Sequence, residues 1–298
     1  MAAGARVCVT TTTWSSEQDE FAWVALRSQR KRLRDLLAAF DEDAWRVQSR
    51  CSEWTVHEVV RHLCDVTAKA AALLAGAPTE DVEASGMDPR TSPRDWLAHS
   101  RGETPDKTVH RFLEADQALL AQVAHCRVSP RDVGWVYGAV PWSIAVLHLF
   151  WDAWIHERDI LLPLGEQQTS PAHEQRAAAA YGILIASLPN VALGRSFAEE
   201  LVLSGSGGGW FGLEVRSGGG DARQLTMVGL PASGTVSVTA AEDVDPESAS
   251  AAPLTGRLVD VVDALVGRDP ELLAALAGPS ERVERLSIFR NFMLAPIV

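Results

Sequence analysis

The chain has 298 residues, of which 47% are hydrophobic and 22% are charged, a balance typical of a globular protein long enough for two domains. Its formal net charge of −12 argues against a nucleic-acid partner, because such binders carry a basic patch. The most basic segment, RSQRKRLRD at 27–35, is interpreted as the solvated face of a helix.

The location of the protein is inferred from its cysteines and apolar runs. No run of about 18 apolar residues occurs, so we expect no membrane partner. The opening segment MAAGARVCVTTTTW lacks the apolar core of a secretion signal and is expected to be a loose tail. The four cysteines form no C-x-x-C pair. We therefore expect reduced thiols and a cytoplasmic protein.

The first half of the sequence predicts four long amphipathic helices, because apolar residues recur at steps of three and four. Thr55 followed by Glu58 forms a capping box, and Pro141 suits a first helical turn. Residues 78–93 are rich in Gly, Pro and Asp and predict a long loop. Four such helices predict a bundle. They are expected at 20–40, 55–74, 105–124 and 141–162.

The second half changes to a mixed pattern. An alanine-rich helix is expected at 172–187, followed by β-like runs at 200–203, 210–216, 224–228 and 235–239, then helices at 255–266 and 270–276. The glycines Gly207, Gly209 and Gly212 fit G-x-G-x-x-G, but no helix follows them, so a hairpin turn is expected.

The whole pattern predicts an α+β fold, with an N-terminal four-helix bundle over 1–166 and a small C-terminal α/β domain over 167–298. The boundary is placed near 166–170, where polar residues follow the last bundle helix.

The segment WDAWIHERD places Asp152 and His156 on one face of a helix, because residues four apart differ by about 40° around its axis. A carboxylate and an imidazole at this spacing suit one divalent metal ion. A hydrogen-bonded or surface pair remains the alternative. His62 lies among valines and leucines and is the best candidate for a third ligand, with a satisfied core histidine as its alternative.

Several nearby residues are candidates for supporting roles. His148 lies on the same stripe as Asp152 and is a ligand, a supporting group or a cavity-lining residue. Asp159 could accept a hydrogen bond from a ligand imidazole. Arg158 is a candidate substrate-binding residue, with an exposed arginine as the alternative. His57 is five residues from His62, too far round the helix to share its metal, and is expected to be exposed near the helix start.

Three stretches resemble the mycothiol-dependent maleylpyruvate isomerase family, within the DinB-like metalloproteins. The first is CSEWTVHEVVRHL at 51–63, the second VPWSIAVLHLFWDAWIHERDILLPLG at 140–165, and the third TGRLVDVVDALVGRDPELLAAL at 255–276. The resemblance implies a DinB-like bundle that holds a divalent metal ion, usually zinc, through His62, Asp152 and His156. At position 152 this chain has aspartate where the family usually has glutamate.

The resemblance also implies the chemistry. A low-molecular-weight thiol, mycothiol or a similar one, would be activated on the metal as a thiolate, so no protein side chain is predicted as the reactive group. The thiolate would attack a small electrophile, such as a carboxylic acid, in S-transfer or thiol-assisted cis–trans isomerisation. The alternatives are a non-catalytic protein of the same fold that binds a small ligand or a partner, and a metal-assisted hydrolase.

Overall fold

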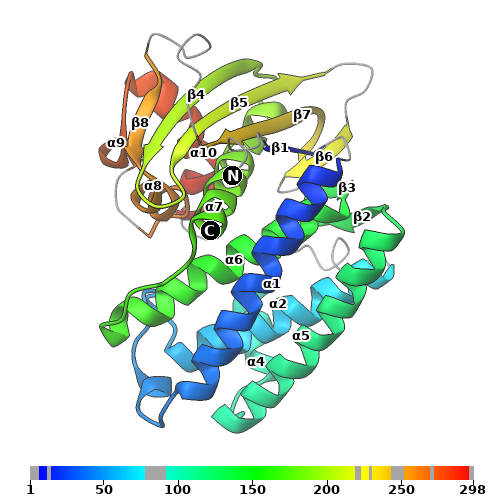
Figure 1. The fold of residues 1–298 in the computed structure, drawn as a ribbon, viewed down its shortest axis with the longest axis vertical. Coiled ribbons are helices and arrows are strands. Elements are labelled where there is room, and N and C mark those ends of the chain that lie inside the picture. Colours follow the sequence, from blue (N-terminus) through cyan, green and yellow to red (C-terminus); the bar gives the residue numbers. More distant parts are fainter. Residues whose placement is uncertain are drawn as a thin grey trace.

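A computed structural model describes residues 7–11, 15–77, 92–218, 223–227, 230–242, 252–268 and 272–294. A helical bundle forms one end of the molecule and a mixed sheet with its own helices forms the other (Figure 1). The α+β fold predicted from the sequence is confirmed. No helix among these residues is both long and apolar enough to cross a membrane.

The bundle consists of the four predicted helices, and each begins where the sequence provides a start signal. Thr55 caps the second helix with the expected reciprocal bonds to Glu58. Pro105 lies in the first turn of the third helix, and Pro141 is the N-cap residue of the fourth. The helices are α1 (Ser16–Ala39), α2 (Val56–Ala75), α5 (Pro105–Val128) and α6 (Trp142–Leu161).

Short elements connect the bundle helices. A 3-10 turn (Ala44–Arg46) follows α1, and another (Leu162–Leu164) follows α6. Helix α4 (Ser92–His99) lies against α2. Strands β2 (Asp132–Trp135) and β3 (Gly138–Pro141) form a hairpin that leads directly into α6.

The second part is a seven-stranded sheet in the order β1-β7-β5-β4-β8-β9, with β6 also paired to β7. All pairs are antiparallel except β4 with β8. The strands are β1 (Val7–Thr10), β4 (Phe197–Ser204), β5 (Gly209–Ser217), β6 (Arg223–Met227), β7 (Leu230–Ala241), β8 (Leu254–Arg257) and β9 (Leu276–Ala277).

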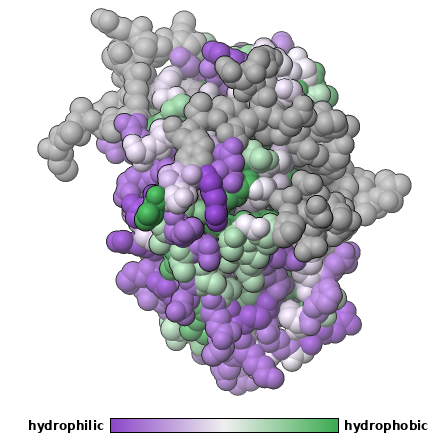
Figure 2. Space-filling model, turned by 90° about the vertical axis from the view of Figure 1, so that its right-hand side faces the viewer, coloured by the Kyte–Doolittle hydropathy of each residue, from purple (hydrophilic) through white to green (hydrophobic). Residues whose placement is uncertain are grey.

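Helix α7 (Ala172–Ala192) joins the two parts, because it packs against α1 and α6 on one side and against β5 and β7 on the other (Figure 1). Its alanines allow this close packing, since nearly every residue from Ala177 to Val191 is buried. The face in Figure 2 mixes hydrophilic side chains with a more hydrophobic area across its middle. Three further helices, α8 (Leu258–Leu265), α9 (Leu272–Ala275) and α10 (Ser280–Leu294), complete this part.

Several sequence expectations are wrong in detail. The segment expected to be a loose tail contains β1, which pairs with β7 across most of the chain length. Residues 254–257 form a strand instead of a helix start, because Leu254 to Arg257 extend alongside β4. Helices α4 and α10 were not predicted. The loop predicted at 78–93 lies, up to residue 91, outside the described residues. The predicted hairpin turn at the glycine cluster is confirmed by the pairing of β4 with β5.

The basic segment of α1 is not simply a solvated face. Arg30 is only 1% exposed and donates a hydrogen bond to Thr67. Arg32 forms ion pairs of 2.6 Å with both Glu157 and Glu174, whose side chains are fully buried. The segment therefore ties α1 to α2, α6 and α7. Sequence periodicity could not reveal this, because the acidic partners lie more than 120 residues away.

Candidate metal centre

The three predicted ligands lie together between α2 and α6. The distance from His62 Nε2 to Asp152 Oδ2 is 3.8 Å, and from His156 Nε2 to Asp152 Oδ1 it is 3.7 Å. One potential ligand atom from each residue lies within 4.8 Å of the other two. The two imidazole rings are in edge contact, with centroids 4.9 Å apart. The residues brought together are thus the set that the sequence patterns suggested.

These positions follow from the local structure of α6. The helix is apolar on nearly all sides, and every residue from Trp142 to Leu161 is buried except His148, Asp152 and Arg158. Asp152 keeps 21% of its side chain exposed. A carboxylate in such a helix needs a positive partner, since burying an unpaired charge is costly.

The spacing of the three side chains fits a divalent ion. Two ligand atoms about 2.1 Å from a tetrahedral zinc ion lie roughly 3.4 Å apart, close to the distances found here. The observed distances of 3.7 and 3.8 Å are too long for hydrogen bonds. Asp152 Oδ2 is buried without a hydrogen-bond partner among the described residues. His62 Nδ1 is also buried and unpartnered. The arrangement is therefore poorly satisfied as a hydrogen-bond network but well suited to ligation.

Asp159 fixes the orientation of His156. The Nδ1–H of His156 donates to Asp159 Oδ2 at 3.0 Å, which leaves Nε2 directed towards Asp152. A carboxylate behind a metal-ligating histidine commonly fixes its tautomer in this way. Burial disfavours the charged imidazole, but Asp152 and Asp159 outweigh this effect and raise the pKa of His156 to about 10. The same ion pair keeps the pKa of Asp159 below its ordinary value, against the opposing effect of burial.

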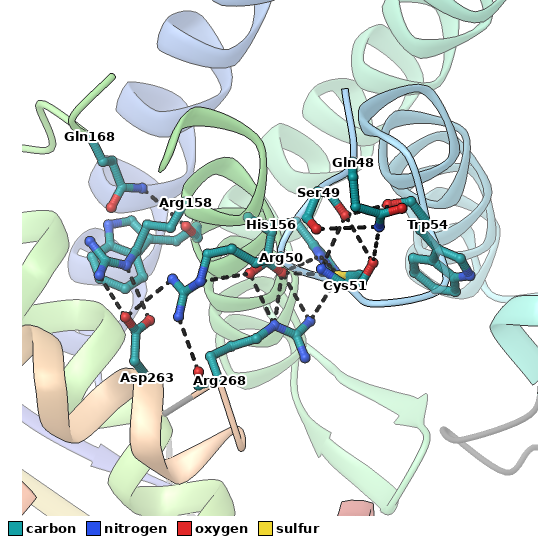
Figure 3. A network of polar contacts seen from close by, with 12 residues as sticks. Gln48, Ser49, Arg50, Cys51, Trp54, His156, Arg158, Gln168, Asp263 and Arg268 are labelled. Atoms are coloured by element: carbon teal, nitrogen blue, oxygen red, sulfur yellow. Dashed lines mark hydrogen bonds and ion pairs between the residues drawn. The ribbon is translucent and has the colours of Figure 1, made fainter. Parts of the chain in front are cut away.

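A polar network links this centre to the second part of the chain (Figure 3). Arg268 Nε lies 3.0 Å from both carboxylate oxygens of Asp159, and its Nη2 lies 3.2 Å from Cys51 Sγ. The Cys51 thiol donates to Asp159 Oδ2 at 3.3 Å. On the other side of the network, Arg50 and Arg158 both pair with Asp263 of α8. Asp159 therefore receives hydrogen bonds from three different elements.

Local backbone structure explains why Arg268 reaches the centre. Helix α8 is followed by Val266 and then Gly267, whose φ of +74° lies in the left-handed region favoured by glycine. The Arg268 N–H then bonds back to the Asp263 carbonyl at 2.8 Å. This helix end turns the chain sharply, and Figure 3 shows Arg268 extending towards Cys51.

Cys51, His156 and Asp159 form a second group with ligand atoms within 4.8 Å. It is the weaker candidate for a cation, because Arg268 already donates to both Cys51 and Asp159. The first group contains no arginine contact within hydrogen-bond distance among the described residues. The centre is therefore assigned to His62, Asp152 and His156.

The other predicted site residues are placed as follows. Arg158 pairs with Asp263 at 2.6 Å and lies over the Trp154 ring, so its charge is already neutralised. His148 is near the centre but bonds to Tyr181 instead of a predicted ligand. His57 is half-buried rather than exposed, because it bonds to Thr108 and packs against Trp45. Cys64 is fully buried.

Sequence reasoning missed the residues that surround the three ligands. Cys51, Trp54 and Arg50 lie in the segment before α2, and Arg268 follows α8. Trp54 lies against both ligand imidazoles, with ring centroids 5.2 Å from His62 and 6.3 Å from His156. The only available signal was the position of Cys51, Trp54 and Arg268 inside the stretches that carry the family resemblance.

The fold and the candidate centre define a class: a four-helix bundle with a His-Asp-His group that could hold a metal ion on two facing helices, followed by an α/β part. Residues 26–161 match the family model described as the mycothiol maleylpyruvate isomerase N-terminal domain. The N-terminal part of the chain is therefore similar to that domain.

Solved structures agree with this similarity at the level of the fold. A crystal structure of mycothiol-dependent maleylpyruvate isomerase is similar, with a TM-score of 0.51 and 14% identity, and one of its mutants has a TM-score of 0.53 and 15% identity. Each likeness covers 88% of this chain and 93% of the other. No curated protein sequence matches this chain significantly.

Proposed function

We propose that this chain is a metal-dependent enzyme that uses a low-molecular-weight thiol, mycothiol or a similar one, on a small electrophilic substrate. The proposal is supported chiefly by the convergence of His62, Asp152 and His156: each imidazole Nε2 lies 3.7 to 3.8 Å from an Asp152 oxygen, and Asp152 Oδ2 has no hydrogen-bond partner among the described residues. Three protein ligands leave a coordination position open, which is typical of catalytic rather than structural zinc sites.

Zinc bound at such a site lowers the pKa of a thiol, so that the thiolate is present at neutral pH. The protein residues prepare the site. Asp159 holds the Nδ1–H of His156 at 3.0 Å, which directs the other ring nitrogen towards Asp152. Trp54 lies against both ligand imidazoles and covers that side of the centre. Arg268 pairs with Asp159 at 2.9 Å and so holds the carboxylate that orients His156.

The chemical outcome depends on what happens to the thiol adduct. If the adduct rotates and expels the thiol, the reaction is a cis–trans isomerisation, which is the reaction named for the structurally similar enzyme. If the thiol stays on the carbon, the reaction is S-transfer. The shorter carboxylate at Asp152 is a departure from the family and favours a substrate other than maleylpyruvate.

The proposal is tested by incubating the zinc-loaded protein with mycothiol and maleylpyruvate and following both compounds by chromatography. Isomerisation converts the substrate and returns the thiol, whereas S-transfer consumes both. His62→Ala should abolish either reaction, while the matched surface variant His110→Ala, at a side chain 75% exposed, should leave it unchanged. Turnover that is independent of the thiol would instead identify a hydrolase. An active His62→Ala protein would contradict the proposal.

A further inference from the structure

Three buried side chains form a hydrogen-bonded chain that ends beside the candidate metal centre. Tyr137, in the turn between β2 and β3, lies with its hydroxyl 2.6 Å from the Tyr181 hydroxyl of α7. The Tyr181 hydroxyl lies 2.8 Å from Nδ1 of His148 in α6. Tyr137 and Tyr181 are 1% and 0% exposed. The chain thus connects the hairpin and α7 to the ligand-bearing helix.

The buried end of this chain determines its direction. Among the described residues, the Tyr137 hydroxyl has no partner other than Tyr181. If it only accepted a hydrogen bond, its own proton would be buried without an acceptor, which is costly. Tyr137 therefore donates to Tyr181, and Tyr181 donates to Nδ1 of His148. A neutral His148 must then carry its proton on Nε2.

The environment keeps all three groups uncharged. Burial lowers the pKa of His148 to about 4, although Asp152 opposes this effect, so the imidazole is neutral near pH 7. Burial raises the pKa values of both tyrosines, so both keep their protons. Trp135, Trp151 and Tyr181 pack around the His148 ring and hold it in place.

The free edge of His148 lies on the accessible side of α6. His148 and Asp152 are one helical turn apart, and they are two of only three residues between Trp142 and Leu161 that are not buried. Residues four apart on a helix lie on the same face. His148 Nε2 is also not among the buried polar atoms that lack a partner. His148 and Asp152 therefore lie on the same partly exposed face of α6.

We propose that His148 is a ligand-binding residue, whose Nε2–H donates a hydrogen bond to a carbonyl or carboxylate oxygen of the molecule bound at the metal centre. Tyr181 and Tyr137 are positioning residues that fix its tautomer. The inference rests on the proposed function for the location of that molecule. The direction of the hydrogen-bonded chain is independent of it.

The tautomer is tested first, on the full-length zinc-loaded protein labelled with ¹⁵N in its histidines. Protonated and unprotonated ring nitrogens have well-separated ¹⁵N shifts, and His148→Gln assigns the signal. We expect Nε2 to be protonated and Nδ1 unprotonated in the wild type. Tyr181→Phe, which removes the donor to Nδ1, should introduce the second tautomer while the melting temperature shows that the protein is folded. A wild-type His148 protonated on Nδ1 would overturn the inference.

Ligand binding is tested with maleate, a stable cis-dicarboxylate, titrated into the same zinc-loaded protein. His148→Phe should weaken binding about ten- to a hundredfold, the range for a hydrogen bond to a charged group. His148→Gln, which keeps an N–H donor at a similar reach, should bind within about threefold of the wild type. Equal binding by His148→Phe, or no binding of maleate by the wild type, would overturn the inference.

Activity measurements separate this inference from the proposed function. Maleate binding that depends on His148, without any turnover of maleylpyruvate or consumption of mycothiol, supports the role of His148 and contradicts the proposed enzyme. Turnover with kcat/KM unchanged in His148→Phe supports the enzyme and contradicts the role of His148.

Discussion

Metal binding at this centre should be strongly dependent on pH and should release a proton. In the metal-free protein the two carboxylates around His156 outweigh its burial and raise its pKa to about 10. Its Nε2 must lose a proton before it can bind a metal ion. A pH of 7 is about three units below that pKa, so the proton must be removed from a mostly charged imidazole. At about 1.4 kcal/mol per unit, this makes the apparent free energy of zinc binding less favourable by about 4 kcal/mol.

Apparent zinc affinity should therefore rise about tenfold per pH unit between pH 7 and 9, or about a hundredfold over this range. Isothermal titration calorimetry in two buffers of different ionisation enthalpy should give close to one proton released per zinc ion at pH 7.5. Because the pKa of His156 is raised in the folded protein, its charged form stabilises the metal-free fold. This contribution is complete below about pH 6.5, the ordinary histidine pKa, and it is lost as the pH rises through about 10.

The exposed His110 provides the matched control, and His110→Ala should leave both the slope and the proton count unchanged. Zinc affinity that is independent of pH from 7 to 9, with no proton released, would refute the reasoning, because it would mean that His156 is not a ligand or is not held in the charged form.

Three further predictions concern the residues around the centre. Asp159→Asn should weaken zinc binding about 10- to 100-fold, measured by competition with a fluorescent chelator. The asparagine amide cannot accept from both His156 and Arg268 as the carboxylate does. A circular dichroism spectrum unlike that of the wild type would mean that the variant is misfolded. Arg32→Met leaves the buried carboxylates of Glu157 and Glu174 unpaired and should lower the free energy of unfolding in urea by about 3–5 kcal/mol. The matched variant at an exposed site, Arg46→Met, should change it by under about 1 kcal/mol. Equal losses would refute the stabilising role of the Arg32 ion pairs. Cys64, whose pKa burial raises to about 12, should react with iodoacetamide only after unfolding, and rapid modification of the folded protein would show that the helix interface opens.

The bundle could be predicted from the sequence because its signals are local. The capping box at Thr55 and the apolar repeat of each helix act within a few residues, so the positions of α1, α2, α5 and α6 follow closely. Asp152 and His156 could be paired for the same reason, since four residues always bring side chains to one helix face. His62 needed a tertiary contact: its apolar surroundings made it the best candidate for a third ligand, and the family resemblance grouped it with the other two.

The parts that could not be predicted depend on distant contacts. Val7 to Thr10 form a strand only because β7 provides a partner more than 220 residues later. Arg268 reaches Asp159 because Gly267 turns the chain at the end of α8, and nothing near Asp159 in the sequence indicates that approach. Arg158 was expected to be open to substrate, but its partner Asp263 lies in a helix over 100 residues away.

The central claim is that one divalent ion binds between α2 and α6. It is tested most directly by anomalous diffraction at the zinc edge from crystals of the zinc-loaded protein. The account predicts one strong peak about 2.0–2.2 Å from His62 Nε2, an Asp152 carboxylate oxygen and His156 Nε2. The absence of a peak there, or a peak at Cys51, His156 Nδ1 and Asp159 instead, would contradict it.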